Sequence, residues 1–254
     1  MLKFFLAAFI VLQLACNAQV NLQYIANMGV LLSDGENAVL IDALHEEYKP
    51  AYLFPSSETV ENLAEGTYTE ASIQYILFTH LHKDHCSQKL AKQFLEKNEN
   101  AKLVASQQAV AQLGGAYQSQ LKGLEMGEFH KEMKEDLSVL AYACEHVNPK
   151  HVGVENLTFI VSFSGRNYMH VGDSNWDELL NCLTHKVAAG LEFEGIILPY
   201  WMYYDKQLSN KLKKLPASKK YYAAHLPPDF SEAQRLEQKL PGLILLQEPN
   251  KVYN

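Results

Sequence analysis

An apolar run followed at once by a polar one places the strongest limit on how this chain can fold. Residues 73–79 (Ile-Gln-Tyr-Ile-Leu-Phe-Thr) have the length and composition of a buried strand. The run His80-Leu81-His82-Lys83-Asp84-His85 comes next. Imidazole and carboxylate groups suit zinc, iron or manganese, and a chain leaving a sheet can turn its residues toward different targets. The run predicts a metal site at a strand end: its first two histidines would hold one ion, and its final Asp-His pair would face a second.

The composition is that of one globular domain. The chain has 254 residues, of which 48% are hydrophobic and 20% charged, so it can bury a sizeable core without disulfide bonds. The net charge of −7 argues against nucleic-acid binding, which needs a basic surface. We therefore expect no nucleic-acid partner, and the sequence leaves the oligomeric state open.

Residues 1–18 have the pattern of a signal peptide. A positively charged start precedes an apolar run at 4–12, and small residues follow up to Ala18. The apolar run is shorter than the ~20 residues of a membrane-spanning helix. We expect cleavage after Ala18, a periplasmic or secreted protein without a transmembrane segment after processing, and a mature domain at 19–254. Lipid attachment through Cys16 is the alternative.

Export would leave Cys86, Cys144 and Cys182 in the mature chain. Three cysteines cannot all pair internally, and none belongs to a CxxC motif. We expect buried thiols rather than a disulfide framework.

Segments with strand and helix patterns alternate along the rest of the chain. Strands are expected at 22–25, 29–33, 38–42, 73–79, 102–106, 137–143, 157–163, 167–171 and 195–199. Helices are expected at 87–97, from 107 onward, and at 178–189, 206–215 and 231–239. The charged stretch around His130 also favours a helix. Hairpin-like pairs near the start and the middle predict an α+β fold of two sheets covered by helices.

The sequence resembles the metallo-β-lactamase-fold hydrolases. Residues 27–43 resemble the opening hairpin of that superfamily, and the run at 80–85 matches its HxHxDH motif. Its GD motif matches Gly172-Asp173, and its late histidine matches His225. The order holds across nearly all of the mature chain. The resemblance implies a four-layer αβ/βα sandwich with two metal ions at one edge.

The same resemblance implies ligands for two divalent ions, with zinc expected and iron or manganese as alternatives. The implied ligands are His80, His82 and a third histidine for the first ion, Asp84, His85 and His225 for the second, and Asp173 between them. Two histidines could complete the first set. His146 fits better, because it directly follows the apolar segment at 137–144, and His151 is the alternative.

The implied activity is metal-dependent hydrolysis, in which a hydroxide shared by two ions attacks a small-molecule ester, lactone or phosphodiester. Asp84 would also be catalytic by accepting a proton. The retained Asp173 argues against a true β-lactamase, since members with a cysteine ligand carry it at that position. The alternatives are a mononuclear iron dioxygenase acting on a persulfide and a non-catalytic metal-binding protein.

An aromatic run at 200–204 lies between the GD motif and the late histidine. Tyr200 and Trp201 are candidates for substrate contact, because aromatic rings can form a cleft wall. An aromatic cluster that only caps the sandwich is the alternative. His45 has a structural role or lines the cleft, since it follows the turn at Asp42.

Overall fold

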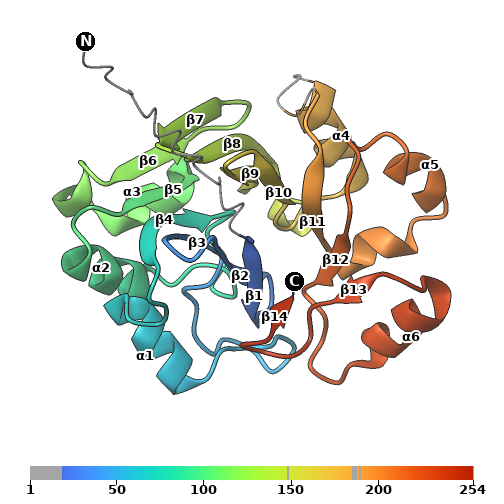
Figure 1. Ribbon diagram of the computed structural model, residues 1–254, viewed down its shortest axis with the longest axis horizontal. Coiled ribbons are helices and arrows are strands. Elements are labelled where there is room, and N and C mark those ends of the chain that lie inside the picture. The colour runs from blue at the N-terminus through green and yellow to red at the C-terminus, as the bar shows by residue number, and fades with distance from the viewer. Residues whose placement is uncertain (1–18, 148, 185–187, 189, 254) are drawn as a thin grey trace, which may run out of the picture.

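Two seven-stranded sheets form the centre of the molecule (Figure 1). The first, in spatial order, consists of β14 (Val252–Tyr253), β1 (Asn21–Ala26), β2 (Gly29–Ser33), β3 (Asn37–Ile41), β4 (Ser72–Phe78), β5 (Lys102–Ser106) and β6 (Leu121–Leu124). The second consists of β13 (Ile244–Leu245), β12 (Tyr221–Ala224), β11 (Phe193–Pro199), β10 (Arg166–His170), β9 (Glu155–Phe163), β8 (Leu137–Glu145) and β7 (Phe129–Lys134). This computed structural model describes residues 19–147, 149–184, 188 and 190–253.

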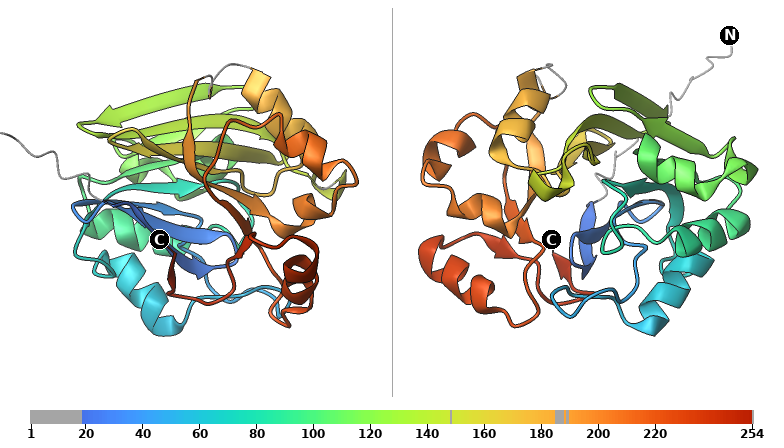
Figure 2. Two further views of the ribbon diagram at one scale, coloured as in Figure 1. Left: turned by 45° about the vertical axis from the view of Figure 1, so that its right-hand side comes forward. Right: turned by 180° about the vertical axis from the view of Figure 1, so that it is seen from behind.

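Helices cover the outer face of each sheet, as the two views of Figure 2 show. The first sheet carries α1 (Ser57–Glu65), α2 (Gln88–Lys97) and α3 (Gln107–Leu113), followed by the short 3₁₀ helix η1 (Gly115–Tyr117). The second carries α4 (Trp176–Thr184), α5 (Leu208–Leu212), α6 (Ser231–Lys239) and the 3₁₀ helix η3 (Tyr200–Tyr204). A further 3₁₀ helix, η2 (Pro149–His151), links β8 to β9. The four layers confirm the predicted αβ/βα sandwich.

The predicted signal peptide lies outside the described residues. Within the described part of the chain, the helices are all too short or too polar to cross a bilayer.

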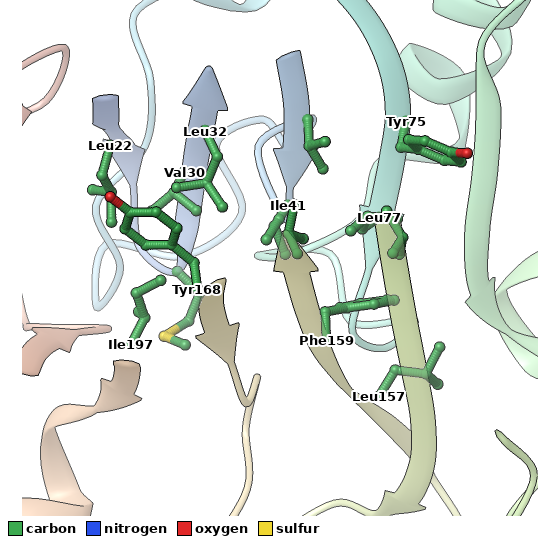
Figure 3. Close-up of a cluster of buried hydrophobic side chains, with 14 of the residues drawn as sticks. Leu22, Val30, Leu32, Ile41, Tyr75, Leu77, Leu157, Phe159, Tyr168 and Ile197 are labelled. Carbon is green, nitrogen blue, oxygen red and sulfur yellow. The ribbon is translucent and has the colours of Figure 1, made fainter. Parts of the chain in front are cut away.

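The largest apolar core lies between the two sheets. Val30 and Leu32 of the first sheet belong to the same buried cluster as Phe159 and Ile197 of the second (Figure 3). Leu31 points the other way, into the layer beneath the helices. Because successive side chains of a strand alternate between faces, a strand covered on both sides reads as a continuous apolar run. Each such side chain contributes about 1.5–3 kcal/mol when fully buried.

Strand direction brings distant residues to one edge of the sandwich. Strands β3 and β4 are parallel, so the segments that follow them leave the first sheet on the same side. In the second sheet, β8 and β10 are both antiparallel to β9 and therefore run in the same direction. Strands β11 and β12 are parallel to β10. The residues after β8, β10 and β12 therefore also share an edge, which lies beside that of β3 and β4.

Two expectations for the elements were wrong. The stretch around His130 is strand β7, which pairs antiparallel with β8 from Phe129↔Tyr142 to Lys134↔Leu137. It is an edge strand whose exposed residues are Phe129, Lys131, Met133 and Lys134, and pairing with β8 outweighs its local pattern. The helix expected at 206–215 is limited to the five residues of α5.

Gly172, which follows β10, lies where the two sheets approach each other closely at this edge. Its φ is +61°, and a Cβ there would lie 2.4 Å from Asn156 Oδ1 and 2.6 Å from Thr79 Cβ. We expect Gly172→Ala to lower the free energy of unfolding by about 3 kcal/mol, because a left-handed backbone costs an L-residue roughly 1–2 kcal/mol and overpacking adds about 1–3 kcal/mol. Gly165 also has a positive φ but no atom within 4 Å of the added Cβ. Gly165→Ala should lose about 1 kcal/mol, and equal losses in urea unfolding would rule out the clash.

Candidate metal centre

The side chains predicted as ligands meet where the two sheet edges adjoin. They form three overlapping groups, and within each group the ligand atoms lie within 4.8 Å of one another. The groups are His80, His82 and His146; His80, His85 and Asp173; and Asp84, His85 and His225. His151 belongs to none of them, although its ring lies 4.5 Å from that of His82. All seven expected side chains are therefore brought together, with His146 in the place of the third histidine.

Asp173 faces both ends of this cluster. Its Oδ1 lies 3.4 Å from His85 Nε2 and 3.7 Å from His225 Nε2. Its Oδ2 lies 3.4 Å from His146 Nε2 and 3.9 Å from His80 Nε2. A carboxylate that turns a different oxygen to each group of imidazoles is suited to lie between two cations.

Asn27 links Asp84 to His225. Its side-chain amide donates to the backbone oxygen of Asp84 at 3.0 Å and to Asp84 Oδ2 at 3.3 Å. Its backbone oxygen accepts from the His225 N–H at 2.9 Å. Asp84 Oδ2 in turn lies 3.4 Å from His225 Nε2. The β1–β2 turn therefore holds a carboxylate of the first sheet against a histidine of the second.

A hydrogen-bonded network beneath the cluster orients two histidines. Asp42, directly after β3, accepts from the Thr79 N–H at 2.8 Å and from the Thr79 hydroxyl at 2.6 Å. The same carboxylate lies 2.8 Å from His85 Nδ1, and Thr79 Oγ1 lies 3.0 Å from His80 Nδ1. Because the Thr79 hydroxyl donates its hydrogen to Asp42, its oxygen accepts from His80 Nδ1, and Asp42 accepts from His85 Nδ1. Nε2 is therefore the atom that each ring offers to the site. No motif in the sequence marks Asp42 or Thr79 for this role.

The buried polar atoms fit metal ions. Nε2 of His80 and Nε2 of His85 are buried and have no hydrogen-bond partner among the described residues. Burying such an atom without a partner is costly, and a cation would provide one. Imidazole nitrogens with carboxylate oxygens form a donor set for zinc, iron or manganese. The cluster is therefore suited to bind metal.

Neighbouring charges shift the pKa values of the cluster in opposite directions. Burial, and then His85 and His146, lower the pKa of His80 well below its ordinary value. Burial and His146 likewise lower the pKa of His82 to about 4. Burial also acts to lower the pKa of His85, but Asp173, Asp42 and Asp84 raise it overall to about 10. Without a metal, His85 is the imidazolium that balances the carboxylates, whereas His80 and His82 are neutral.

A cavity of about 430 Å³ opens beside the cluster. Besides ligand candidates, its lining includes Tyr52, Val147, His151 and Trp201. Trp201 was expected there from the sequence. Tyr200 is not among the described lining residues, and its ring packs 5.5 Å from that of Trp201. Tyr52 was missed, because its segment after β3 carries neither a motif nor a clear periodicity.

His45 is buried outside the described lining of this cavity. Burial, and then His85, lower the pKa of His45 to about 4. The position of His45 therefore favours a structural role over a place in the cleft.

Metal binding should release a proton from His85. A pKa of about 10 keeps this imidazole protonated at pH 8, whereas a ligated imidazole must be deprotonated. We expect release of about one proton per chain at pH 8, seen by calorimetry of zinc binding in buffers of different ionisation enthalpy. The apparent affinity should rise with pH for the same reason. A binding heat independent of the buffer would contradict this protonation state.

The network beneath the cluster should strengthen metal binding. We expect Asp42→Asn to weaken zinc affinity by about 10–100-fold, the usual effect of losing a partner that orients a ligating histidine. Asp34→Asn is the matched control, because Asp34 accepts hydrogen bonds only within the β2–β3 turn in the described structure. Competition with a chromogenic chelator measures both affinities. Equal affinities in the two variants would show that Asp42 does not orient a ligand.

Comparison with known proteins relies on structure alone, since no protein-family model and no curated protein match the sequence. The chain is similar to Igni18, a metallo hydrolase from the archaeon Ignicoccus hospitalis, with 17% identity over 92% of this chain and 97% of that one and a TM-score of 0.60. It is also similar to an isothiocyanate hydrolase from Delia radicum gut bacteria, with 14% identity, 92% and 98% coverage and a TM-score of 0.59. The metallo-β-lactamase fold protein YhfI from Bacillus subtilis shares 12% identity over 93% and 100% of the two chains, with a TM-score of 0.58. This chain has the metallo-β-lactamase fold.

Proposed function

We propose that this protein is a dinuclear metal-dependent hydrolase of a small-molecule ester, lactone or phosphodiester. The observation that carries the proposal is a set of three overlapping groups of candidate ligands beside a cavity. Asp173 lies within 3.9 Å of at least one histidine of each group. Zinc is the expected metal. The names of two similar structures, a metallo hydrolase and an isothiocyanate hydrolase, support hydrolysis as the class of reaction.

Each residue has a defined task in this proposal. Two bound cations lower the pKa of a shared water toward neutrality and polarise a carbonyl or phosphoryl oxygen. His80, His82 and His146 would hold the first cation, and Asp84, His85 and His225 the second. Asp173, whose two oxygens face different histidines, would contribute to holding both.

Asp84 has a second task, which is to accept the proton that the attacking water loses. Its Oδ2 accepts a hydrogen bond from the side-chain N–H of Asn27, which orients the carboxylate. The opposing effects of burial, which raises its pKa, and of His85 and His225, which lower it, leave the pKa of Asp84 below its ordinary value. The group is therefore ionised at neutral pH, as both a metal ligand and a proton acceptor must be.

Substitution of Asp84 and His85 tests the proposal. We expect Asp84→Asn to lower kcat by about 10²–10⁴-fold, the range for losing a positioned acid–base group. His85→Ala should lower kcat at least as far, because it removes a ligand of the second cation. Metal analysis should find two zinc ions per wild-type chain and fewer in His85→Ala. The substrate panel contains an ester, a lactone, a thioester, a phosphodiester, a β-lactam and an isothiocyanate.

His130→Ala is the control, because His130 lies on the edge strand β7 and contacts Glu132 rather than the site. Full activity in metal-free protein or in Asp84→Asn would exclude the dinuclear mechanism. A single redox-active iron per chain would instead favour dioxygenase chemistry.

A further inference from the structure

Strand β7 forms one edge of the second sheet, and in the described structure no strand pairs with its outer side (Figure 1). Directly before β7, the backbone oxygen of Glu128 accepts from the N–H of Ala143 in β8 at 3.0 Å. In an antiparallel pair, the backbone groups of every second residue face the partner strand, so the even-numbered residues of β7 bond to β8. The N–H and C=O groups of Phe129, Lys131 and Met133 therefore point outward from the edge of the sheet, where hydrogen bonds to another strand can form.

The outward residues also carry an exposed apolar surface. Phe129 is 49% exposed and Met133 67%, and Met126, in the turn before β7, is 45% exposed. These are three of the seven exposed large hydrophobic residues in the described part of the chain. On the other face of β7, Lys134 donates to Gln74 Oε1 of the first sheet, so that face is directed into the sandwich. An unpaired edge and apolar side chains thus lie together at one rim of the molecule, a combination that marks an interaction site.

A second copy of this edge fits the first in one antiparallel register. Outward residues must face outward residues for the backbone groups to bond, and three such pairs form when Lys131 lies opposite Lys131 of the second copy. Phe129 then faces Met133 at both ends, and His130 faces Glu132 on the other side of the sheet. Aromatic–thioether contacts and imidazole–carboxylate pairs are favourable across strands. A shift by two residues in either direction sets Glu132 opposite a glutamate and leaves two backbone pairs instead of three.

We propose that two copies of this chain associate through β7, which joins their second sheets into one continuous sheet about a two-fold axis at Lys131. About six backbone hydrogen bonds form, two from each facing pair of outward residues. The two Lys131 side chains are the one pair of like charges set opposite each other, and their flexible stems allow the ammonium groups to diverge. The two-fold contact occupies both free edges, so association ends at the dimer. None of the described ligand candidates lies on β7, and the association does not depend on hydrolase activity.

Sedimentation velocity of the purified protein measures this association. A contact of one strand pair is small, and small interfaces have dissociation constants in the micromolar range. We therefore expect twice the mass of one chain at about 100 µM and the mass of one chain at about 0.1 µM. The mass of one chain at the higher concentration would overturn the proposal and leave the edge to an extended segment of another protein.

Two substitutions of Lys131 act on this contact in opposite directions. Lys131→Pro removes an outward N–H without taking a hydrogen bond from β8, and we expect the dimer to bind about tenfold more weakly. Lys131→Thr removes the facing like charges and should tighten the dimer by about two- to fivefold. Urea unfolding of the dilute proteins, followed by tryptophan fluorescence, checks that each monomer remains folded. Equal dissociation constants for Lys131→Pro and the wild type would place the contact elsewhere and overturn the proposal.

Phe129→Lys and Met133→Glu test the register. Alone, each sets charged side chains against apolar ones at both ends of the contact and should weaken the dimer by about tenfold. In a mixture of the two variants, the introduced ammonium faces the introduced carboxylate at one end and the native pair is kept at the other, so the mixed dimer should recover most of the lost affinity. Val252→Lys is the matched control, because Val252 is 45% exposed on β14, an edge strand of the first sheet. A mixture that binds no tighter than either variant alone, or an equal loss in Val252→Lys, would overturn the proposed contact.

Discussion

The buried carboxylate of Asp42 is the group on which the geometry of the site depends. It is fully buried and accepts hydrogen bonds from the Thr79 amide, the Thr79 hydroxyl and His85 Nδ1. Because an ionised carboxylate in such surroundings is stable only when it is fully hydrogen-bonded, each of these donors is held in one orientation. Thr79 passes that orientation on to His80. The Asp42 carboxylate, directly and through Thr79, thus determines which ring nitrogen of His85 and of His80 faces the site.

Three of the seven described non-glycine residues with a positive φ lie at this site. Asn27, Asp42 and His225 all have positive φ values, of 53°, 49° and 60°. For residues other than glycine this conformation costs of order 1–3 kcal/mol and persists only where the surroundings hold it. One hydrogen bond joins two of these residues, since the backbone oxygen of Asn27 accepts from the N–H of His225. The rest of the sandwich, with its two-sided apolar sheets, supplies the stability that this local strain requires.

The sequence was most informative where a residue follows a buried strand. The run at 80–85, Asp173 and His225 each leave a strand at the shared edge, so motif and strand pattern together predicted where they gather. His146 was favoured over His151 for the same reason, and the structure places His146 in a ligand group. The edge strand β7 was not recognised, because its partner β8 determines its conformation. Tyr52 was missed because nothing local distinguishes it; only the fold of the segment after β3 brings it to His225.

The ligand candidates come from both halves of the chain, and this division has a consequence for how the protein opens. His80, His82, Asp84 and His85 leave the first sheet, whereas His146, Asp173 and His225 leave the second. Neither sheet by itself assembles a full set of donors. A cation bound here would stabilise only the arrangement in which the two sheets are docked, because its ligands come from both. Loss of such a cation would weaken the docking of the two sheets over the large apolar core that lies between them.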